Sequence, residues 1–251
     1  QDPENGTAGP LASTSPCVNV IPIEDPTIDD TEMDYLGYKR PKGSGYDMGA
    51  YEYIGTQTYT DTLPGGTGLV TDYDIFTLPL DIGTGQNMLD KMEATLGSYN
   101  QATWRVFSHT TNGDVEMNTQ AFASLDIKPG LGLWGITTLT NTISFSGTLA
   151  PDAIYYKIEL APGWHLFAVP WPDTSINLGK IYVTDGVSQY VITDGSNTLT
   201  QQKIWDYTGT GPTNGYVERT ATDFSLTDGV GFFIKVLGSS NIILSIPPDN
   251  D

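Results

Sequence analysis

The amino-acid sequence predicts an all-β protein, and three observations support this fold class. Its 251 residues include 28 glycines, 16 prolines and 14 tyrosines, which is typical of many short strands joined by tight turns. The chain lacks the long stretches of Ala, Leu, Glu and Lys that a helical bundle would need. In addition, the same series of strand and turn motifs occurs twice along the chain. We therefore expect a short N-terminal segment followed by two tandem, related, β-sandwich-like modules.

The N-terminal segment, residues 1–55, contains irregular acidic turns and ends in a glycine turn followed by a short strand. Its stretches Ser15–Asn19 (SPCVN) and Asp47–Tyr53 (DMGAYEY) resemble the C-terminal end of bacterial right-handed parallel β-helix proteins, which commonly finish with an SPC turn and a DIGAYEY strand. Val20 departs from that pattern, since the family usually has Gly there. The resemblance implies a β-helix-like end segment, the last rung or cap of a helix whose body would lie upstream.

The remaining chain is predicted to contain two copies of one β module, residues 56–150 and residues 151–251. In each copy an aromatic strand precedes an Asn-Gly turn, a Val-Glu strand comes next, and a Gly-x-Gly step leads into an apolar strand. Asn-Gly favours a tight hairpin, because both residues tolerate positive φ, and Gly-x-Gly permits a bend or bulge. The matching segments are 104–107 with 204–207, 112–116 with 214–218, 130–134 with 229–233, and 142–145 with 241–246.

A hairpin and a helix complete the predicted elements. Residues 155–160 and 164–169 are expected to form the hairpin, and residues 73–80 to take the matching place in the first copy. A short helix is expected near residues 87–97, where a glycine can end it. The apolar side chains that indicate this helix by their spacing are Met88, Leu89, Met92 and Leu96.

Three stretches of the repeat resemble a module found near the C-termini of large exported bacterial surface proteins. They are Tyr99–Phe107, Pro129–Thr137 and Leu160–Pro170, and they match a pattern of W-R-hydrophobic, PG-x-G-hydrophobic-W and L-x-PGWN-hydrophobic. The resemblance covers roughly residues 73–247, and His165 departs from the usual Asn. It implies a secreted, extracellular protein and brings no known catalytic residues. We further expect the chain to be a processed piece of a longer precursor.

The net charge of the chain limits the classes of partner that we expect. Eleven basic and 30 acidic residues give a net charge of −19, distributed along the whole length. Such a field repels nucleic acid and anionic membrane surfaces, so we expect no nucleic-acid partner. No apolar run approaches the roughly 20 residues of a membrane span, so we expect no membrane insertion.

The acidic residues suggest one metal site, which would hold a structural calcium ion. No other cofactor is expected. Calcium prefers six to eight oxygen ligands from carboxylates and carbonyls. The densest carboxylate cluster consists of Asp29, Asp30, Glu32 and Asp34. Its spacing does not match an EF-hand loop.

The sequence does not predict an enzyme. His109 and His165 lie in different copies without a linking motif, and Cys17 is the single cysteine and has no basic residue beside it. Neither a Gly-x-Ser-x-Gly elbow nor a zinc-binding pattern is present. Glu116 and Glu218 both come directly after Asn-Gly-x-Val. We interpret them as solvent-facing strand residues, with ion or ligand binding as the alternative.

The five tryptophans are the strongest candidates for a binding role. Trp104 and Trp205 are interpreted as equivalent core anchors of the two copies, and Trp134 aligns with Phe233, another core-like position. Trp171 stands between two prolines in an apparent loop. An exposed indole can stack on a sugar ring, so Trp171 is the carbohydrate-stacking candidate.

These features together predict an extracellular structural or cell-surface protein. Tyr- and Thr-rich strands with exposed edges suit self-association, so we expect a self-assembling subunit of an appendage or filament. Its expected partners are other copies of the same chain or other surface proteins. Two alternatives remain open. The first is a carbohydrate-binding or adhesive module with a polysaccharide partner. The second is the C-terminal fragment of a β-helix polysaccharide lyase or hydrolase.

Overall fold

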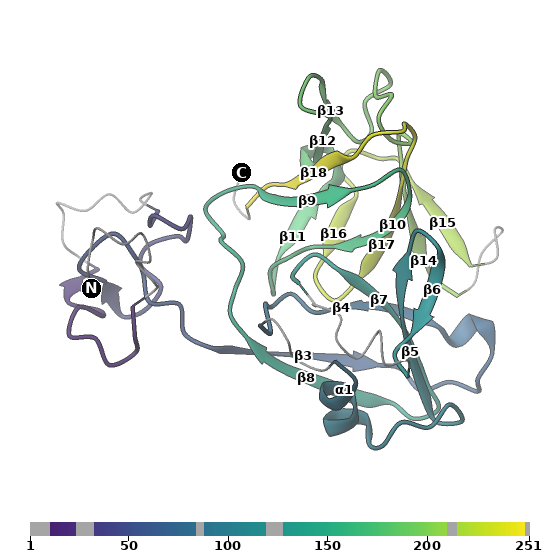
Figure 1. Ribbon diagram of the computed structural model, residues 1–251, viewed down its shortest axis with the longest axis horizontal. Coiled ribbons are helices and arrows are strands. Elements are labelled where there is room, and N and C mark those ends of the chain that lie inside the picture. The colour runs from purple at the N-terminus through teal and green to yellow at the C-terminus, as the bar shows by residue number, and fades with distance from the viewer. Residues whose placement is uncertain (1–10, 24–32, 84–87, 119–127, 210–214, 249–251) are drawn as a thin grey trace.

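The protein is all-β, which confirms the predicted fold class (Figure 1). A computed structural model describes residues 11–23, 33–83, 88–118, 128–209 and 215–248. In these ranges it contains one α-helix, two single-turn 3₁₀ helices, and strands that pair antiparallel throughout the sheets. The predicted helix is confirmed as α1, Met88–Leu96, and the two residues on its buried face are Met88 and Met92.

The first module is built around one four-stranded sheet. The sheet order is β4-β7-β5-β6, and β3 pairs separately with β8 over seven residues. The helix α1 packs against β8, and a core of aliphatic, Met and aromatic side chains lies between these layers. The strands are β3 Gln57–Leu63, β4 Asp74–Thr77, β5 Trp104–Thr110, β6 Gly113–Glu116, β7 Gly132–Thr137 and β8 Asn141–Gly147. The 3₁₀ helix Val70–Asp72 precedes β4.

The second module has its own four-stranded sheet, in the order β10-β17-β14-β15. A further sheet has the order β13-β12-β18-β9, and β11 pairs with β16. The strands are β9 Tyr156–Leu160, β10 Gly163–Ala168, β11 Ser175–Asn177, β12 Tyr182–Thr184, β13 Gln189–Val191, β14 Ile204–Tyr207, β15 Tyr216–Arg219, β16 Ser225–Thr227, β17 Gly231–Val236 and β18 Ile242–Ile246. A 3₁₀ helix, Leu178–Lys180, joins β11 to β12.

The two four-stranded sheets have the same strand order. In chain order β4, β5, β6 and β7 take the places of β10, β14, β15 and β17. The outer pairs also match, because β3 pairs with β8 as β9 pairs with β18. The modules differ in the elements that come after the first sheet strand, which are α1 in the first module and β11 to β13 in the second.

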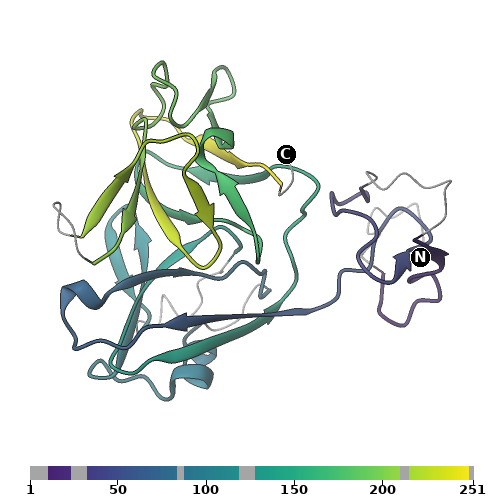
Figure 2. The ribbon, with the colours of Figure 1, turned by 180° about the vertical axis from the view of Figure 1, so that it is seen from behind.

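The N-terminal segment lies apart from the body of the molecule, at the end of β3 (Figures 1 and 2). Its described part contains one small sheet, formed by β1 (Ile21–Pro22) and β2 (Gly45–Tyr46). The resemblance to a β-helix end therefore stays a prediction. The segment docks on the linker between the modules, where Lys39 N donates to Asp152 and Lys42 forms an ion pair with the same carboxylate.

Buried carboxylates organise this segment more than apolar side chains do. Glu52 is 1% exposed and accepts hydrogen bonds from Arg40 Nε at 2.7 Å and from the amides of Asp47 and Lys42. Asp47 is 1% exposed and accepts from the amide of Tyr53. Because buried carboxylates must be paired, Asp47 and Glu52 of the DMGAYEY stretch are structural residues here.

A third apolar cluster joins the two modules. Its buried residues are Ile75 and Trp134 from the first module and Leu166 and Phe233 from the second. The sheets approach closely because a glycine faces each aliphatic side chain across the boundary. A Cβ on residue 132 would lie 2.7 Å from Leu166 Cγ, and a Cβ on residue 231 would lie 2.2 Å from Ile75 Cγ2.

Candidate functional site: an aromatic groove between the modules

The strand registers place equivalent residues of the two modules face to face. Trp134 pairs with Ile75 and Phe107, and Phe233 pairs with Leu166 and Trp205. Side chains alternate between the two faces of a strand, so every second residue from these positions points to the module boundary. The equivalent pairs on this face are Tyr73 with Trp164, Ile75 with Leu166, Phe107 with Trp205, His109 with Tyr207, Asp114 with Tyr216, and Trp134 with Phe233.

This register corrects one sequence-based equivalence. Trp205 corresponds to Phe107 and not to Trp104, because both Phe107 and Trp205 lie opposite the glutamate that comes after the Asn-Gly turn. Trp104 points to the other face of its sheet, where it is 2% exposed and donates its indole N–H to Gly97 O. Trp104 is thus a core anchor as predicted, whereas Trp205 is half-buried at the module boundary.

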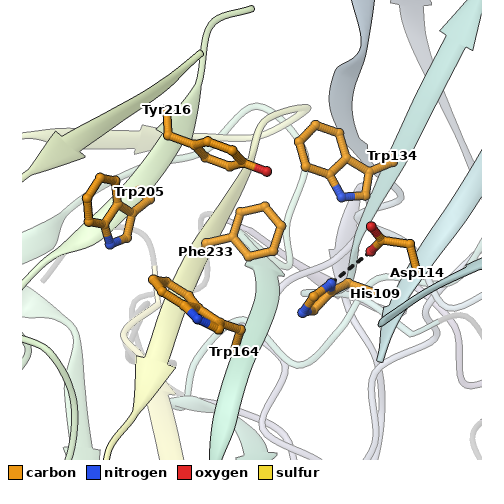
Figure 3. A pocket seen from close by; sticks show the side chains of 7 residues that line it. All are labelled: His109, Asp114, Trp134, Trp164, Trp205, Tyr216 and Phe233. Carbon is orange, nitrogen blue, oxygen red and sulfur yellow. Dashed lines mark hydrogen bonds and ion pairs between the residues drawn. The ribbon is translucent and has the colours of Figure 1, made fainter. Parts of the chain in front are cut away.

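A cavity of about 380 Å³ opens at this boundary (Figure 3). We call it the first cavity. Its volume lies within the range of about 300–1,000 Å³ that is usual for small-ligand sites. The lining side chains are Trp134, Trp164, Trp205, Tyr216 and Phe233, together with His109 and Asp114.

The rings around Phe233 meet mostly edge to face. Trp164 lies 6.3 Å from Phe233 at an interplanar angle of 83°, and Tyr216 lies 5.8 Å from it at 69°. Trp164 and Trp205 are 6.4 Å apart at 68°. Rings at such angles leave space between them instead of stacking into a closed column, and Figure 3 shows the other labelled side chains arranged around the Phe233 ring.

His109 and Asp114 give the first cavity its polar side. His109 Nδ1 lies 2.8 Å from Asp114 Oδ1, and the imidazole packs edge to face on Phe233 at 5.1 Å. The Asp114 side chain is 49% exposed. Burial, followed by the charge of nearby Tyr207 and Asp114, raises the pKa of Tyr216 above its ordinary value. Its hydroxyl therefore stays protonated at neutral pH, and the cavity combines one carboxylate with hydroxyl and imidazole groups.

Cationic side chains pack on aromatic rings of the module boundary at equivalent places in the two modules. Arg105 lies 4.8 Å from the Phe107 ring centre and forms an ion pair with Glu116 at 2.7 Å. Lys203 lies 5.0 Å from the Trp205 ring centre and forms an ion pair with Glu218 at 2.8 Å.

These ion pairs revise the interpretation of the two glutamates. Glu218 is exposed, as predicted. Glu116 is half-buried, and it also accepts hydrogen bonds from Tyr99 and Gln101. The hydrogen bonds from Arg105, more than any other contact, hold the pKa of Glu116 below its ordinary value.

The structure contradicts the stacking role predicted for Trp171. Its side chain is 3% exposed within the core of the second module, and its indole N–H donates to the carbonyls of Ala150 and Pro151. A ring covered in this way offers no face to a sugar. The indoles of Trp164 and Trp205, in contrast, are half-buried and line the first cavity.

The predicted calcium ligands are only partly described. Asp29, Asp30 and Glu32 lie outside the described residues. Asp34 is 5% exposed and accepts hydrogen bonds from the amides of Leu36, Tyr38 and Glu52. Within the described ranges, no three His, Cys, Asp or Glu side chains are grouped so that they could hold a metal ion.

The two histidines have separate surroundings. His109 belongs to the first cavity, although the sequence favoured a structural or surface role for it. His165 Nε2 lies 2.6 Å from Ala161 O, and burial lowers the pKa of its imidazole. Sequence reasoning missed Trp164, Trp205 and His109 as a set. A local signal existed for Trp205, because the alternating residues Lys203, Trp205 and Tyr207 put one cation and two aromatic side chains on the same side of an extended segment.

Comparisons with protein-family models, with curated proteins and with solved structures found no match to this chain. Across the described residues, none of the helices has the length and apolar character to cross a membrane.

Proposed function

We propose that this chain is a carbohydrate-binding, adhesive module of an extracellular protein. The observation that carries the proposal is the first cavity, which is lined by five aromatic side chains from two modules and has a half-exposed carboxylate on its polar side. A pyranose ring has C–H groups on its faces and hydroxyls around its rim. Aromatic walls suit the faces, and a few convergent polar groups suit the hydroxyls.

The charge of the protein favours a neutral sugar. With a net charge of −19, the chain repels uronic-acid and sulfated polymers over distances up to the Debye length. The carboxylate of Asp114 lies in the cavity itself and accepts hydrogen bonds, which hydroxyl groups can donate. We therefore expect neutral glycans to bind better than acidic ones.

Binding without hydrolysis is supported by the number of acids at the site. Glycosidases generally use two carboxyl groups that flank the scissile bond, about 5–10 Å apart. Asp114 is the one carboxylate among the described residues that line the first cavity. The proposal accordingly assigns recognition to this site and no catalytic step.

The extracellular setting of the proposal rests on the sequence. The PGWN-like stretches resemble modules of exported bacterial surface proteins, and a strongly acidic surface keeps such a protein soluble. Self-association, or association with other surface proteins, stays a prediction beside the binding role.

A glycan array with the purified chain tests the proposal, with calorimetry on the glycans that bind. Trp205→Ala removes one wall of the first cavity, and Tyr35→Ala is the matched control, because Tyr35 is an aromatic residue that is 79% exposed in the distant N-terminal segment. We expect Trp205→Ala to abolish binding while Tyr35→Ala preserves it. Absence of neutral glycans among the hits, or unchanged affinity in a folded Trp205→Ala protein, would refute the proposal.

A further inference from the structure

A second cavity adjoins the first along the module boundary. It measures about 280 Å³, and its own walls are Val70, Tyr73, Phe107 and Tyr207. Three further lining residues, Asp114, Trp134 and Tyr216, also line the first cavity. Because both cavities are bounded by the same three side chains, they are neighbours at the module boundary, and we call the two together the groove.

The second cavity is the pseudo-symmetric counterpart of the first. Its walls Tyr73 and Phe107 occupy the positions that Trp164 and Trp205 occupy in the other module, and Tyr207 is equivalent to His109. Asp114 is itself equivalent to Tyr216. Because this equivalent pair lines both cavities, Asp114 and Tyr216 lie between the two halves of the groove.

The two halves of the groove differ in chemistry. Two indoles form the outer wall of the first cavity, whereas a phenol and a phenyl ring form that of the second. Tyr73 packs against Trp134 edge to face at 6.2 Å, and Tyr207 does so at 4.8 Å. The Tyr207 hydroxyl donates a hydrogen bond to Val70 O, which holds the Tyr207 ring in place. The second cavity is therefore smaller but has a rigid aromatic wall.

We propose that the two cavities are subsites of one groove that binds a neutral oligosaccharide lengthwise. One sugar unit occupies the first cavity against Trp164 and Trp205, and the next unit occupies the second cavity against Tyr73 and Phe107. The shared residues, with Asp114 among them, lie at the junction of the two units. This inference rests on the proposed sugar-binding function of the first cavity.

The inference requires affinity to depend on chain length. A ligand that fills only the first cavity gains nothing from Tyr73, whereas a longer one gains a second stacking contact without a second loss of translational freedom. We expect affinity to rise at least about tenfold once the ligand spans both cavities, which corresponds to about 1.4 kcal/mol. Further lengthening should then change it little.

Calorimetry with glucose, mannose and their cello-, malto- and manno-oligosaccharides of increasing length tests this inference. Tyr73→Ala should leave the affinity for the shortest binding sugar unchanged and reduce the affinity for long ones to that same level. Trp205→Ala should weaken binding at every length. Phe107→Leu, which keeps an apolar side chain beneath Arg105, repeats the test if Tyr73→Ala unfolds.

The outcomes separate the two proposals. Equal affinity for short and long sugars, all sensitive to Trp205→Ala, would overturn the second subsite and leave the first cavity as a sugar site. Equal weakening of all lengths by Tyr73→Ala would also overturn it. If neither these sugars nor any neutral glycan of the array bound the wild-type protein, the proposed function would fail together with the inference.

Discussion

Substitution of Gly231 by alanine tests how closely the two modules must approach each other. The added Cβ would lie 2.2 Å from Ile75 Cγ2, whereas carbon atoms in contact normally lie about 3.5–4.0 Å apart. The sheets would have to separate, or Ile75 would have to leave its position between Trp134 and Leu166. Overpacking of this kind costs about 1–3 kcal/mol, so we expect Gly231→Ala to lower the free energy of unfolding by that amount.

Chemical denaturation, followed by fluorescence, measures the effect, and a double-mutant cycle identifies its cause. Ile75→Ala alone should cost about 2–5 kcal/mol, because it leaves a cavity between the modules. The double substitution should cost less than the sum by at least about 1 kcal/mol, because the new methyl group fills part of that cavity. Gly195→Ala is the control, since its Cβ would have no atom within 4 Å. Wild-type stability of Gly231→Ala, or simple additivity, would refute the explanation.

Three further predictions concern other parts of the fold. Because the folded-state pKa of Glu116 lies below its ordinary value of 4.5, its ion pair stabilises the protein above that pH and is lost as the pH falls through the folded-state pKa. Glu116→Gln should thus lower stability at neutral pH and flatten the acid limb of a stability-against-pH curve; an unchanged limb would contradict this. Glu52→Ala leaves Arg40 without its buried partner, at a cost of about 3–5 kcal/mol, and should speed proteolysis of the N-terminal segment without shifting the main unfolding transition. Trp171→Ala should cost about 3–5 kcal/mol of stability yet leave sugar affinity unchanged in the folded protein at low temperature, contrary to a stacking role.

Local patterns were sufficient to predict many of the strands of the two modules. The Asn-Gly turns, the Gly-x-Gly steps and the spacing of Met88 and Met92 specify elements through neighbouring residues. The short strand expected after the glycine turn of the N-terminal segment is wrong, because residues 51–54 form no strand. The predicted hairpin of residues 155–160 and 164–169 is wrong, because β9 pairs with β18 and β10 pairs with β17. Of the matching place predicted for residues 73–80, the correspondence of β4 with β10 is confirmed by the common strand order.

The groove depended on information that is not local. Trp171 lies in a loop between β10 and β11, as its flanking prolines indicated, but it is buried there, because the carbonyls of Ala150 and Pro151 that bind its indole come from 20 residues away or more. Trp205 was matched to Trp104 by residue type, although the longer connection between β14 and β15 shifts the correspondence to Phe107. Which sheet face turns toward the other module is decided only by the packing of both modules together.

The equivalence of Trp134 and Phe233 has a consequence for how the chain arose. Each module covers an apolar face of the other, so an ancestral protein with a single module could have buried that face only against a second copy of itself. Such a homodimer would have carried two identical half-grooves. Fusion of two such copies into one polypeptide would release them from that identity, so that one half could carry indoles and the other smaller rings.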